Sequence, residues 1–225
     1  MSNGEIVCKD LVKTYNVGEP NEFTALKGLN LTIKEGEHVS IVGPSGSGKS
    51  TLLNLISCLD TPTKGEVYIE GTGISTLTGF EKAKLRREKL GFVFQQFNLI
   101  KNMTTAENIE LPMRFKGTPK EERTKRVKEL MTLVGLEDKA GNKPTELSGG
   151  EQQRVAVARS LANDPKIILA DEPTGNLDST TGEMILDLLT KLNREEKMTL
   201  VIVTHDAHIA KKASRTIKIQ DGMIA

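Results

Sequence analysis

Cysteine is rare in this sequence, and its rarity excludes two kinds of protein. The 225 residues contain two cysteines, Cys8 and Cys58, which lie far apart and lack the spacing of metal ligands. A disulfide-stapled scaffold and a cysteine-based metal site are therefore both excluded. We expect two reduced thiols that pack inside a cytosolic protein.

Long apolar runs and an excess of charge of one sign are also missing. No stretch approaches the roughly 20 apolar residues of a membrane span, and residues 1–10 lack the apolar core of a signal peptide. The 31 basic and 30 acidic residues leave a net charge of +1, whereas a nucleic-acid-binding surface needs a basic excess. The sequence thus predicts one domain, residues 1–225, with no nucleic-acid partner and no membrane span of its own.

A glycine-rich segment is the most informative motif. Residues 43–50 read GPSGSGKS, fit G-x-x-x-x-G-K-[ST], and lie between a strand-like run at 38–42 and a helix-like run at 51–56. Glycines let backbone N–H groups point at phosphate oxygens, and a helix start adds partial positive charge. The motif predicts a nucleoside triphosphate site, in which Lys49 reaches the β- and γ-phosphates and Ser50 ligates Mg²⁺. The residues expected to bind are Gly43, Pro44, Ser45, Gly46, Ser47, Gly48, Lys49 and Ser50.

The N-terminal part reads as strands and the middle as helices. Residues 5–9, 29–33 and 65–71 alternate between apolar and polar, which predicts an antiparallel sheet beside the nucleotide site. A helical insertion is expected at about 97–150.

One helix of this insertion has clear predicted ends. Thr118 is expected to cap it, with Pro119 as its first residue. Gly135 fits the position just after its end.

The second half alternates helix and strand. A helix is expected at 152–163, and near-continuous apolar strands at 166–170 and 199–203 flank an amphipathic helix. Apolar strands joined by helices indicate a parallel sheet covered on both faces. We therefore expect an α/β fold: a P-loop NTPase core with a parallel sheet, an N-terminal antiparallel β part and an inserted helical part.

Two carboxylates, Asp171 and Glu172, follow the apolar strand at 166–170. Side chains at the carboxyl end of a parallel strand face the ligand crevice. Asp171 is therefore a candidate to hold Mg²⁺, directly or through water, and Glu172 a candidate to meet an attacking water. The alternatives are a helix or turn cap for Asp171 and a solvated surface acid for Glu172.

Further motifs occur in a fixed order along the chain. Residues 147–153 read LSGGEQQ, Gln95 follows the strand-like run GFVF, NLD at 176–178 follows Pro173-Thr174-Gly175, and His205 follows the last apolar strand. LSGGEQQ resembles the signature sequence of ATP-binding cassette (ABC) proteins, and the resemblance covers essentially the whole chain. It implies a RecA-like core that binds ATP and Mg²⁺ and hydrolyses ATP.

The resemblance also implies roles for single residues around the nucleotide. Tyr15 matches the aromatic residue that stacks on adenine, with a half-buried strand tyrosine as the alternative. Thr51 joins the phosphate-binding loop. Gln95 resembles the glutamine that contacts Mg²⁺ and the attacking water and senses the membrane partner; its neighbour Gln96 is the other candidate.

A second group of implied roles concerns hydrolysis. Glu172 resembles the general base, and His205 resembles the switch histidine that contacts the γ-phosphate. Lys49 and Mg²⁺ neutralise the charge of the phosphates. Asp178 resembles the loop aspartate that crosses to a second subunit.

The signature predicts a dimer. Ser148, Gly149 and Gly150 precede a helix, so their N–H groups form an anion site, although Ser148 alone is also explained as a helix cap. In the family that these residues resemble, the signature of one subunit covers the γ-phosphate bound by the other. The resemblance therefore implies a head-to-tail, two-fold homodimer around two ATP molecules.

Within the family, residues 91–99 and 169–178 most resemble the macrolide-exporter and lipoprotein-release (MacB/LolD-type) group. This implies a transmembrane permease as partner and a place at the cytoplasmic face of the cell membrane. The chain is expected to be a separate subunit or part of a longer protein. Some members of one apolar set are expected to form a groove for a short helix of the permease: Phe97, Leu99, Ile100, Met103, Ile109, Leu111 and Met113.

Three other readings are open. A cell-division cassette of the FtsE type shares LSGGEQQR and ADEPTGNLD, and FQQFNL weighs against it. A soluble ABC ATPase of translation or DNA repair usually has tandem cassettes or a long coiled coil. A P-loop kinase needs an acceptor pocket, and a GTPase needs Asn-Lys-x-Asp, which residues 142–145 fail at the last position.

Overall fold

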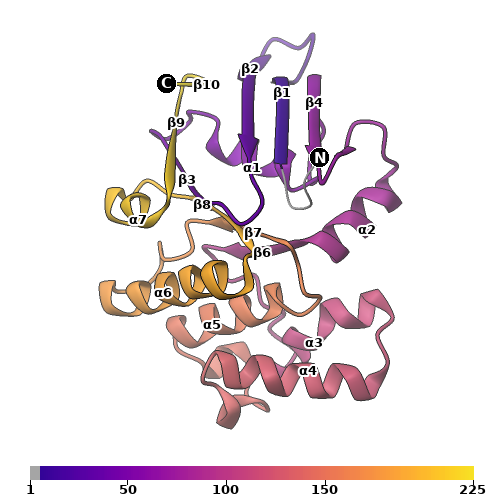
Figure 1. Cartoon of the computed structure of the whole chain (residues 1–225), viewed down its shortest axis with the longest axis vertical. Coiled ribbons are helices and arrows are strands. Elements are labelled where there is room, and N and C mark those ends of the chain that lie inside the picture. The colour runs from indigo at the N-terminus through magenta and orange to yellow at the C-terminus, as the bar shows by residue number, and fades with distance from the viewer. Residues whose placement is uncertain (1–5) are drawn as a thin grey trace.

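A computed structural model describes residues 6–225 and contains two sheets (Figure 1). Glu5, which the sequence places in the first strand, lies outside the described residues. The described chain has the expected α/β architecture, with an antiparallel sheet beside a sheet of mainly parallel strands.

The N-terminal sheet is antiparallel, with the strand order β2-β1-β4-β5. Ile6 of β1 lies opposite Ile33 on one side and Ile69 on the other, and all three are buried. Paired residues on neighbouring strands point to the same face, so these isoleucines show that one face of the sheet lies against the core. The strands are β1 (Ile6–Tyr15), β2 (Phe23–Ile33), β4 (Lys64–Ile69) and β5 (Thr72–Gly73).

The second sheet has the order β10-β9-β3-β8-β7-β6, in which β9, β3, β8, β7 and β6 are parallel. All five residues of β8 are buried, as expected for a parallel strand covered on both faces. The strands are β3 (His38–Val42), β6 (Leu90–Phe94), β7 (Ile167–Asp171), β8 (Thr199–Val203), β9 (Arg215–Gln220) and β10 (Met223–Ile224).

Helices cover both faces of this sheet, and Figure 1 shows α5 and α6 on the face away from the N-terminal sheet. Successive strand residues point to opposite faces: Leu169 packs in the cluster of the antiparallel sheet, whereas Ile168 packs with the helices of the insertion. The helices are α1 (Lys49–Ile56), α2 (Gly79–Lys89), α3 (Thr105–Lys116), α4 (Lys120–Leu133), α5 (Gly149–Ser160), α6 (Ser179–Glu196) and α7 (Ala207–Lys212), with short 3₁₀ turns η1 (Glu137–Lys139) and η2 (Pro144–Glu146).

Two predicted helix starts are wrong. Helix α4 begins at Lys120 with Pro119 as its N-cap and no side-chain cap, so Thr118 does not cap it. The other end is as expected: Gly135, at φ 63°, follows the C-cap Val134. Helix α5 begins at Gly149, three residues before the predicted start.

Cys8 and Cys58 are both buried and free, as predicted. Burial raises the pKa of the Cys8 thiol to about 12. Over residues 6–225, no helix combines the length and the apolar character that a bilayer crossing requires.

Candidate active site

The glycine-rich segment forms a loop between β3 and α1. Gly48 is the N-cap of α1, at φ 105°, and no side chain caps this helix. The ammonium group of Lys49 donates hydrogen bonds to the carbonyl oxygens of Gly43 and Pro44, each with a donor–acceptor distance of 2.8 Å. The loop thus combines a positive charge with an uncapped helix start, which suits an anion.

A separate physical reason requires glycine at each of three positions in the loop. A Cβ on Gly43 would lie 2.1 Å from the carbonyl oxygen of Ile219, and a Cβ on Gly48 would lie 2.8 Å from that of Ala25. Gly46 has open space but a φ of 76°, which glycine adopts without strain. The backbone of this loop therefore requires glycine at all three positions.

A cavity of about 180 Å³ lies beside this loop. Ser50 and Thr51, at the start of α1, line it. Four other residues predicted to bind phosphate do not line it: Gly43, Pro44, Ser45 and the buried Ser47. The full lining is Phe23, Ala25, Gly46, Gly48, Lys49, Ser50 and Thr51.

Phe23 was not predicted for this cavity, and Tyr15 does not line it. The two residues lie directly opposite each other on β2 and β1. The Tyr15 hydroxyl donates to Asp60 over 3.2 Å, and the Lys13 ammonium lies 4.8 Å from the centre of the Tyr15 ring. The place of Phe23 beside this cavity follows from the pairing of β1 with β2. No local sequence motif indicates that pairing.

The two carboxylates lie where β7 ends. Burial, followed by the neighbouring Glu172, raises the pKa of Asp171 above its ordinary value, while the charge of Lys49 opposes the shift. Glu172 has a φ of 46°, an uncommon backbone conformation that is found at functional sites. Its carboxylate lies 2.7 Å from Nδ1 of His205, so the structure brings the predicted base and the predicted switch histidine together.

Gln95 follows β6 directly and pairs with the segment after β7. Its side-chain amide donates to Oδ1 of Asn176 over 3.3 Å, and the Asn176 amide donates to the Gln95 carbonyl over 2.9 Å. Asp178 caps α6 and accepts from the N–H and the hydroxyl of Thr181 over 3.0 and 2.7 Å. Gln95 is thus hydrogen-bonded to the segment 176–178, which ends at Asp178.

The signature residues begin α5. Ser148 is exposed, caps the helix and exchanges hydrogen bonds with Glu151; the N–H of Ser148 lowers the pKa of the Glu151 carboxyl. A Cβ on Gly150 would lie 2.4 Å from Cγ2 of Thr181, while Gly149 lies against Leu177.

Within one copy, the signature is separate from the glycine-rich loop at residues 43–51, which we call the phosphate loop. Ser148, Gly149 and Gly150 are not among the residues that line the cavity beside the loop. The structure does bring the signature to the segment of Asp178, because the starts of α5 and α6 are in contact through Gly150 and Thr181.

Comparison with known proteins decides the family. Residues 26–175 match the family described as ABC transporter. The chain is a member of this family. It is an ATP-binding cassette, and it is 56% identical to the ABC transporter ATP-binding protein MJ0796 of Methanocaldococcus jannaschii, over 97% of this chain and 94% of that protein.

Other relatives have the same character. The cassette is 53% identical, over 96% of its length, to an ABC transporter ATP-binding protein of Thermotoga maritima that it covers to 91%. The macrolide export ATP-binding/permease protein MacB of Aggregatibacter actinomycetemcomitans is 49% identical over 97% of the cassette, which spans 34% of that longer protein.

A solved structure agrees with this assignment. The dimeric post-hydrolysis structure of MJ0796, bound to ADP and Pi, superposes on the cassette with a TM-score of 0.89 at 55% identity, covering 97% of this chain and 96% of that chain. The predicted fold class is thereby confirmed.

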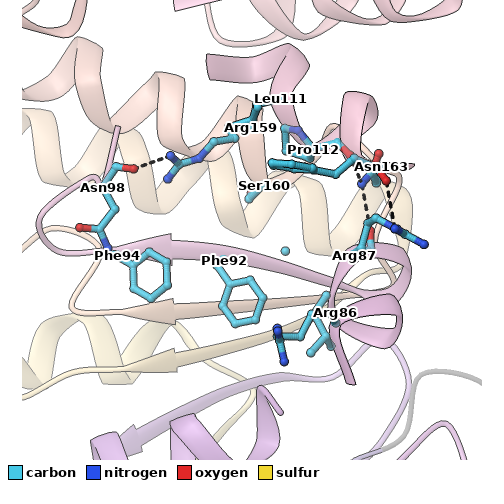
Figure 2. A pocket seen from close by; sticks show the side chains of 14 residues that line it. Arg86, Arg87, Phe92, Phe94, Asn98, Leu111, Pro112, Arg159, Ser160 and Asn163 are labelled. Atoms are coloured by element: carbon cyan, nitrogen blue, oxygen red, sulfur yellow. Dashed lines mark hydrogen bonds between the residues drawn. The ribbon is translucent and has the colours of Figure 1, made fainter. Parts of the chain in front are cut away.

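The cassette also has a larger groove, of about 560 Å³, next to β6 (Figure 2). Figure 2 shows the Phe92 and Phe94 rings side by side on β6, and they stack with centroids 5.8 Å apart. Of the seven apolar residues expected at a partner groove, only Leu111 lines it; Ile109 and Met113 are buried in the core. The lining is Ala83, Arg86, Arg87, Leu90, Gly91, Phe92, Phe94, Asn98, Leu111, Pro112, Phe115, Arg159, Ser160 and Asn163.

Arginines edge the apolar floor of the groove. Arg159 donates to the carbonyl oxygens of Asn98 and Phe97 over 2.6 and 2.8 Å, and burial lowers its pKa. Arg87 donates to the Phe115 carbonyl over 2.9 Å. The sequence alone does not predict this lining, because it comes from α2, β6, α3, α5 and two loop residues, Asn98 and Asn163, whose packing no local pattern encodes.

Proposed function

We propose that the cassette is the ATP-hydrolysing subunit of an ABC transporter and that two copies enclose two ATP molecules. The proposal rests on the start of α5 at Ser148, which is exposed and lies outside the cavity of its own phosphate loop. The N-terminus of a helix favours an anion. A second copy provides the phosphate for it. The dimeric structure of MJ0796 supports this arrangement.

The phosphate loop, from Gly43 to Thr51, holds the triphosphate, with Lys49 on the β- and γ-phosphates. Ser50, Gln95 and Asp171 are the proposed Mg²⁺ ligands. The donor set fits, because Asp171 is destabilised as an anion by burial and by Glu172, and a cation relieves both effects. Residues 6–225 hold no cluster of three or more His, Cys, Asp or Glu side chains suited to a metal; Mg²⁺ needs none, since it usually takes one or two carboxylates together with phosphates and water. When bound, it neutralises charge on the phosphates.

Glu172 is the proposed general base, which accepts a proton from the attacking water at its carboxylate. His205 is proposed to move from its present contact with Glu172 to the γ-phosphate when the dimer closes. The Glu172–His205 contact of 2.7 Å supports this pairing of roles, because it places both side chains at one point of the site. Asp178 is proposed to contact the second copy, and Tyr15 to stack on adenine.

The partner is proposed to be a transmembrane permease of the MacB/LolD type. Its short helix fits the groove next to β6, where Phe92 and Phe94 provide an apolar floor and Arg159 a polar edge. The cassette then lies at the cytoplasmic face of the cell membrane. We also propose a division into one nucleotide-binding domain, 1–225, with a helical subdomain at about 97–150.

The test is the Glu172→Gln variant. It should bind ATP with unchanged affinity, lose turnover by a factor of about 10² to 10⁴, and accumulate a dimer in ATP, because binding is intact and hydrolysis no longer opens the pair. Full ATPase activity of this variant contradicts the role of Glu172. Copurification separates the alternatives: a membrane protein supports transport or the FtsE-type reading, and ribosomes or DNA support a soluble ABC ATPase.

A further inference from the structure

The turn between β9 and β10 contacts the phosphate loop through Gly222. The Gly222 N–H donates to the carbonyl oxygen of Ser47 over 3.1 Å, and the Lys27 N–H donates to the Gly222 carbonyl over 3.0 Å. Gly222 is buried. One residue near the C-terminal end of the chain is therefore bonded to both the phosphate loop and β2.

The three segments meet so closely that no side chain fits between them. A Cβ on Gly222 would lie 2.6 Å from the carbonyl oxygen of Ala25 in β2, and a Cβ on Gly48 would lie 2.8 Å from the same oxygen. A Cβ on Gly43 would lie 2.1 Å from the carbonyl oxygen of Ile219 in β9. Backbone packs on backbone at this point, so a shift of one segment is transmitted to the others.

The turn itself is rigidly specified. Asp221 and Gly222 have φ values of 51° and 82° and separate the paired residues Gln220 and Met223. Two residues with positive φ between paired strands form a type I′ turn, which matches the twist of a hairpin. Strand β9 pairs in turn with β3, the strand that leads into the phosphate loop. The direction of the Gly222 N–H is thus set by the sheet and not by the loop.

This geometry fixes a donor of the phosphate loop. The Ser47 carbonyl and the Gly48 N–H belong to one planar trans peptide group, so they point in opposite directions. The hydrogen bond from Gly222 to Ser47 therefore turns the Gly48 N–H away from the turn, and Gly48 lines the cavity beside the loop.

We propose that Gly222 is a positioning residue that aims the amide donors of the phosphate loop at the phosphates of the nucleotide. The inference rests on the proposed function only in taking phosphate as the ligand of the loop. It assigns a role in nucleotide binding to the β9–β10 turn, which lies outside the sequence motifs found between residues 43 and 205.

The experiment compares dissociation constants of the wild type and Gly222→Ala for ATP, ADP and inorganic tripolyphosphate. The added Cβ forces the turn away from Ala25, so the Ser47 peptide group loses its hydrogen bond. Affinity for all three ligands should fall by the same factor, about tenfold, the equivalent of one misplaced hydrogen bond to a charged group. A loss confined to ATP and ADP, or normal binding by the folded variant, overturns the proposal.

Gly65→Ala is the matched control. Gly65 has a φ of 79°, and a Cβ there would lie 2.3 Å from the carbonyl oxygen of Asp10, so the strain is similar, but the site is in β4. Both variants should melt at a lower temperature, and only Gly222→Ala should bind phosphate more weakly. An equal loss of binding in both variants means that stability alone explains the effect and contradicts the proposal.

A second pair covers the case in which Gly222→Ala does not fold. Lys27→Pro removes the N–H that donates to Gly222, whereas Lys27→Ala keeps it; β2 is the edge strand of its sheet, where proline is tolerated. Tripolyphosphate should bind more weakly to the proline variant than to the alanine variant, and equal binding contradicts the role of Gly222. A wild type that binds neither ATP nor tripolyphosphate contradicts the proposed function instead.

Discussion

Asp171 occupies a position that disfavours its own charge. Burial and the neighbouring Glu172 raise the pKa of its carboxyl, and Lys49 only partly compensates. Between the ordinary pKa of an aspartate and this raised value, the folded protein binds more protons than the unfolded chain, so stability falls as the pH rises through that window. The proposed Mg²⁺ site therefore carries a cost in the nucleotide-free protein.

Asp171→Asn tests this statement. Without nucleotide and with a chelator present, the variant should melt at a higher temperature than the wild type at pH 7, because it has no buried anion beside Glu172. The difference should shrink as the pH falls through the raised pKa of Asp171, because the wild type then gains its proton. Turnover with Mg²⁺ should be lower by a factor on the order of 100. A variant that melts lower at pH 7 contradicts the assignment.

Tyr15 and Phe23 share one face of the N-terminal sheet, and Phe23 lines the cavity beside the phosphate loop. If Tyr15 stacks on adenine, Tyr15→Ala should weaken ATP binding by roughly 1–3 kcal/mol and leave tripolyphosphate binding unchanged. Tyr68→Ala is a suitable control, since Tyr68 also carries a lysine ammonium over its ring, 5.2 Å from the centroid, but lies in β4. Equilibrium titration measures each constant, and equal losses for both ligands contradict base stacking.

Among the elements, three helices begin with a reciprocal capping box, α2 at Thr78 and two that differ in function. Thr104 with Glu107 opens α3, and Ser148 with Glu151 opens α5, each as a reciprocal capping box. Replacing either cap by alanine should cost about 1 kcal/mol of unfolding free energy. The two helix starts differ in function, because only the one at Ser148 belongs to the signature.

Ser148→Ala and Thr104→Ala therefore form a matched pair. Both should lower the melting temperature by a similar amount. Only Ser148→Ala should weaken the ATP-dependent dimer, because its hydroxyl lies where the phosphate of a second copy is expected. Sedimentation of each variant with ATP, in the Glu172→Gln background, measures this; equal dimer fractions contradict a role for Ser148 beyond capping.

The elements also show what a sequence can and cannot predict. The predicted bounds of β3 and β8, 38–42 and 199–203, agree with the structure because each is a short, mainly apolar run. The start of α5 was missed because two glycines disfavour a helix, yet the Ser148–Glu151 box outweighs them. The sequence also does not predict Phe23 beside the phosphate loop or most of the groove lining. These placements depend on strand register and on the packing of elements that are distant in the sequence.

At the scale of the whole molecule, the groove next to β6 should transmit the hydrolysis cycle to a permease. Phe115 is 68% exposed and lines the groove, so Phe115→Asp should leave folding and basal ATPase activity intact. It should lower transport, and with it the amount of cassette recovered with the permease, because a charge is then buried in an apolar contact.

Leu133→Asp is the control for this prediction. Leu133 is 40% exposed and lies at the end of α4, outside the groove. The control should retain both transport and recovery with the permease. If Phe115→Asp transports as well as Leu133→Asp does, the permease contacts another surface.

The central claim is that the phosphate loop of one copy and the signature of the other complete a single site. Its most direct test is sedimentation of Glu172→Gln in ATP, with and without the added change Gly149→Arg. We expect a dimer for the Glu172→Gln protein, and for the doubly substituted protein a monomer that still binds ATP with unchanged affinity. A monomer in the first case, or a dimer that persists in the second, contradicts it.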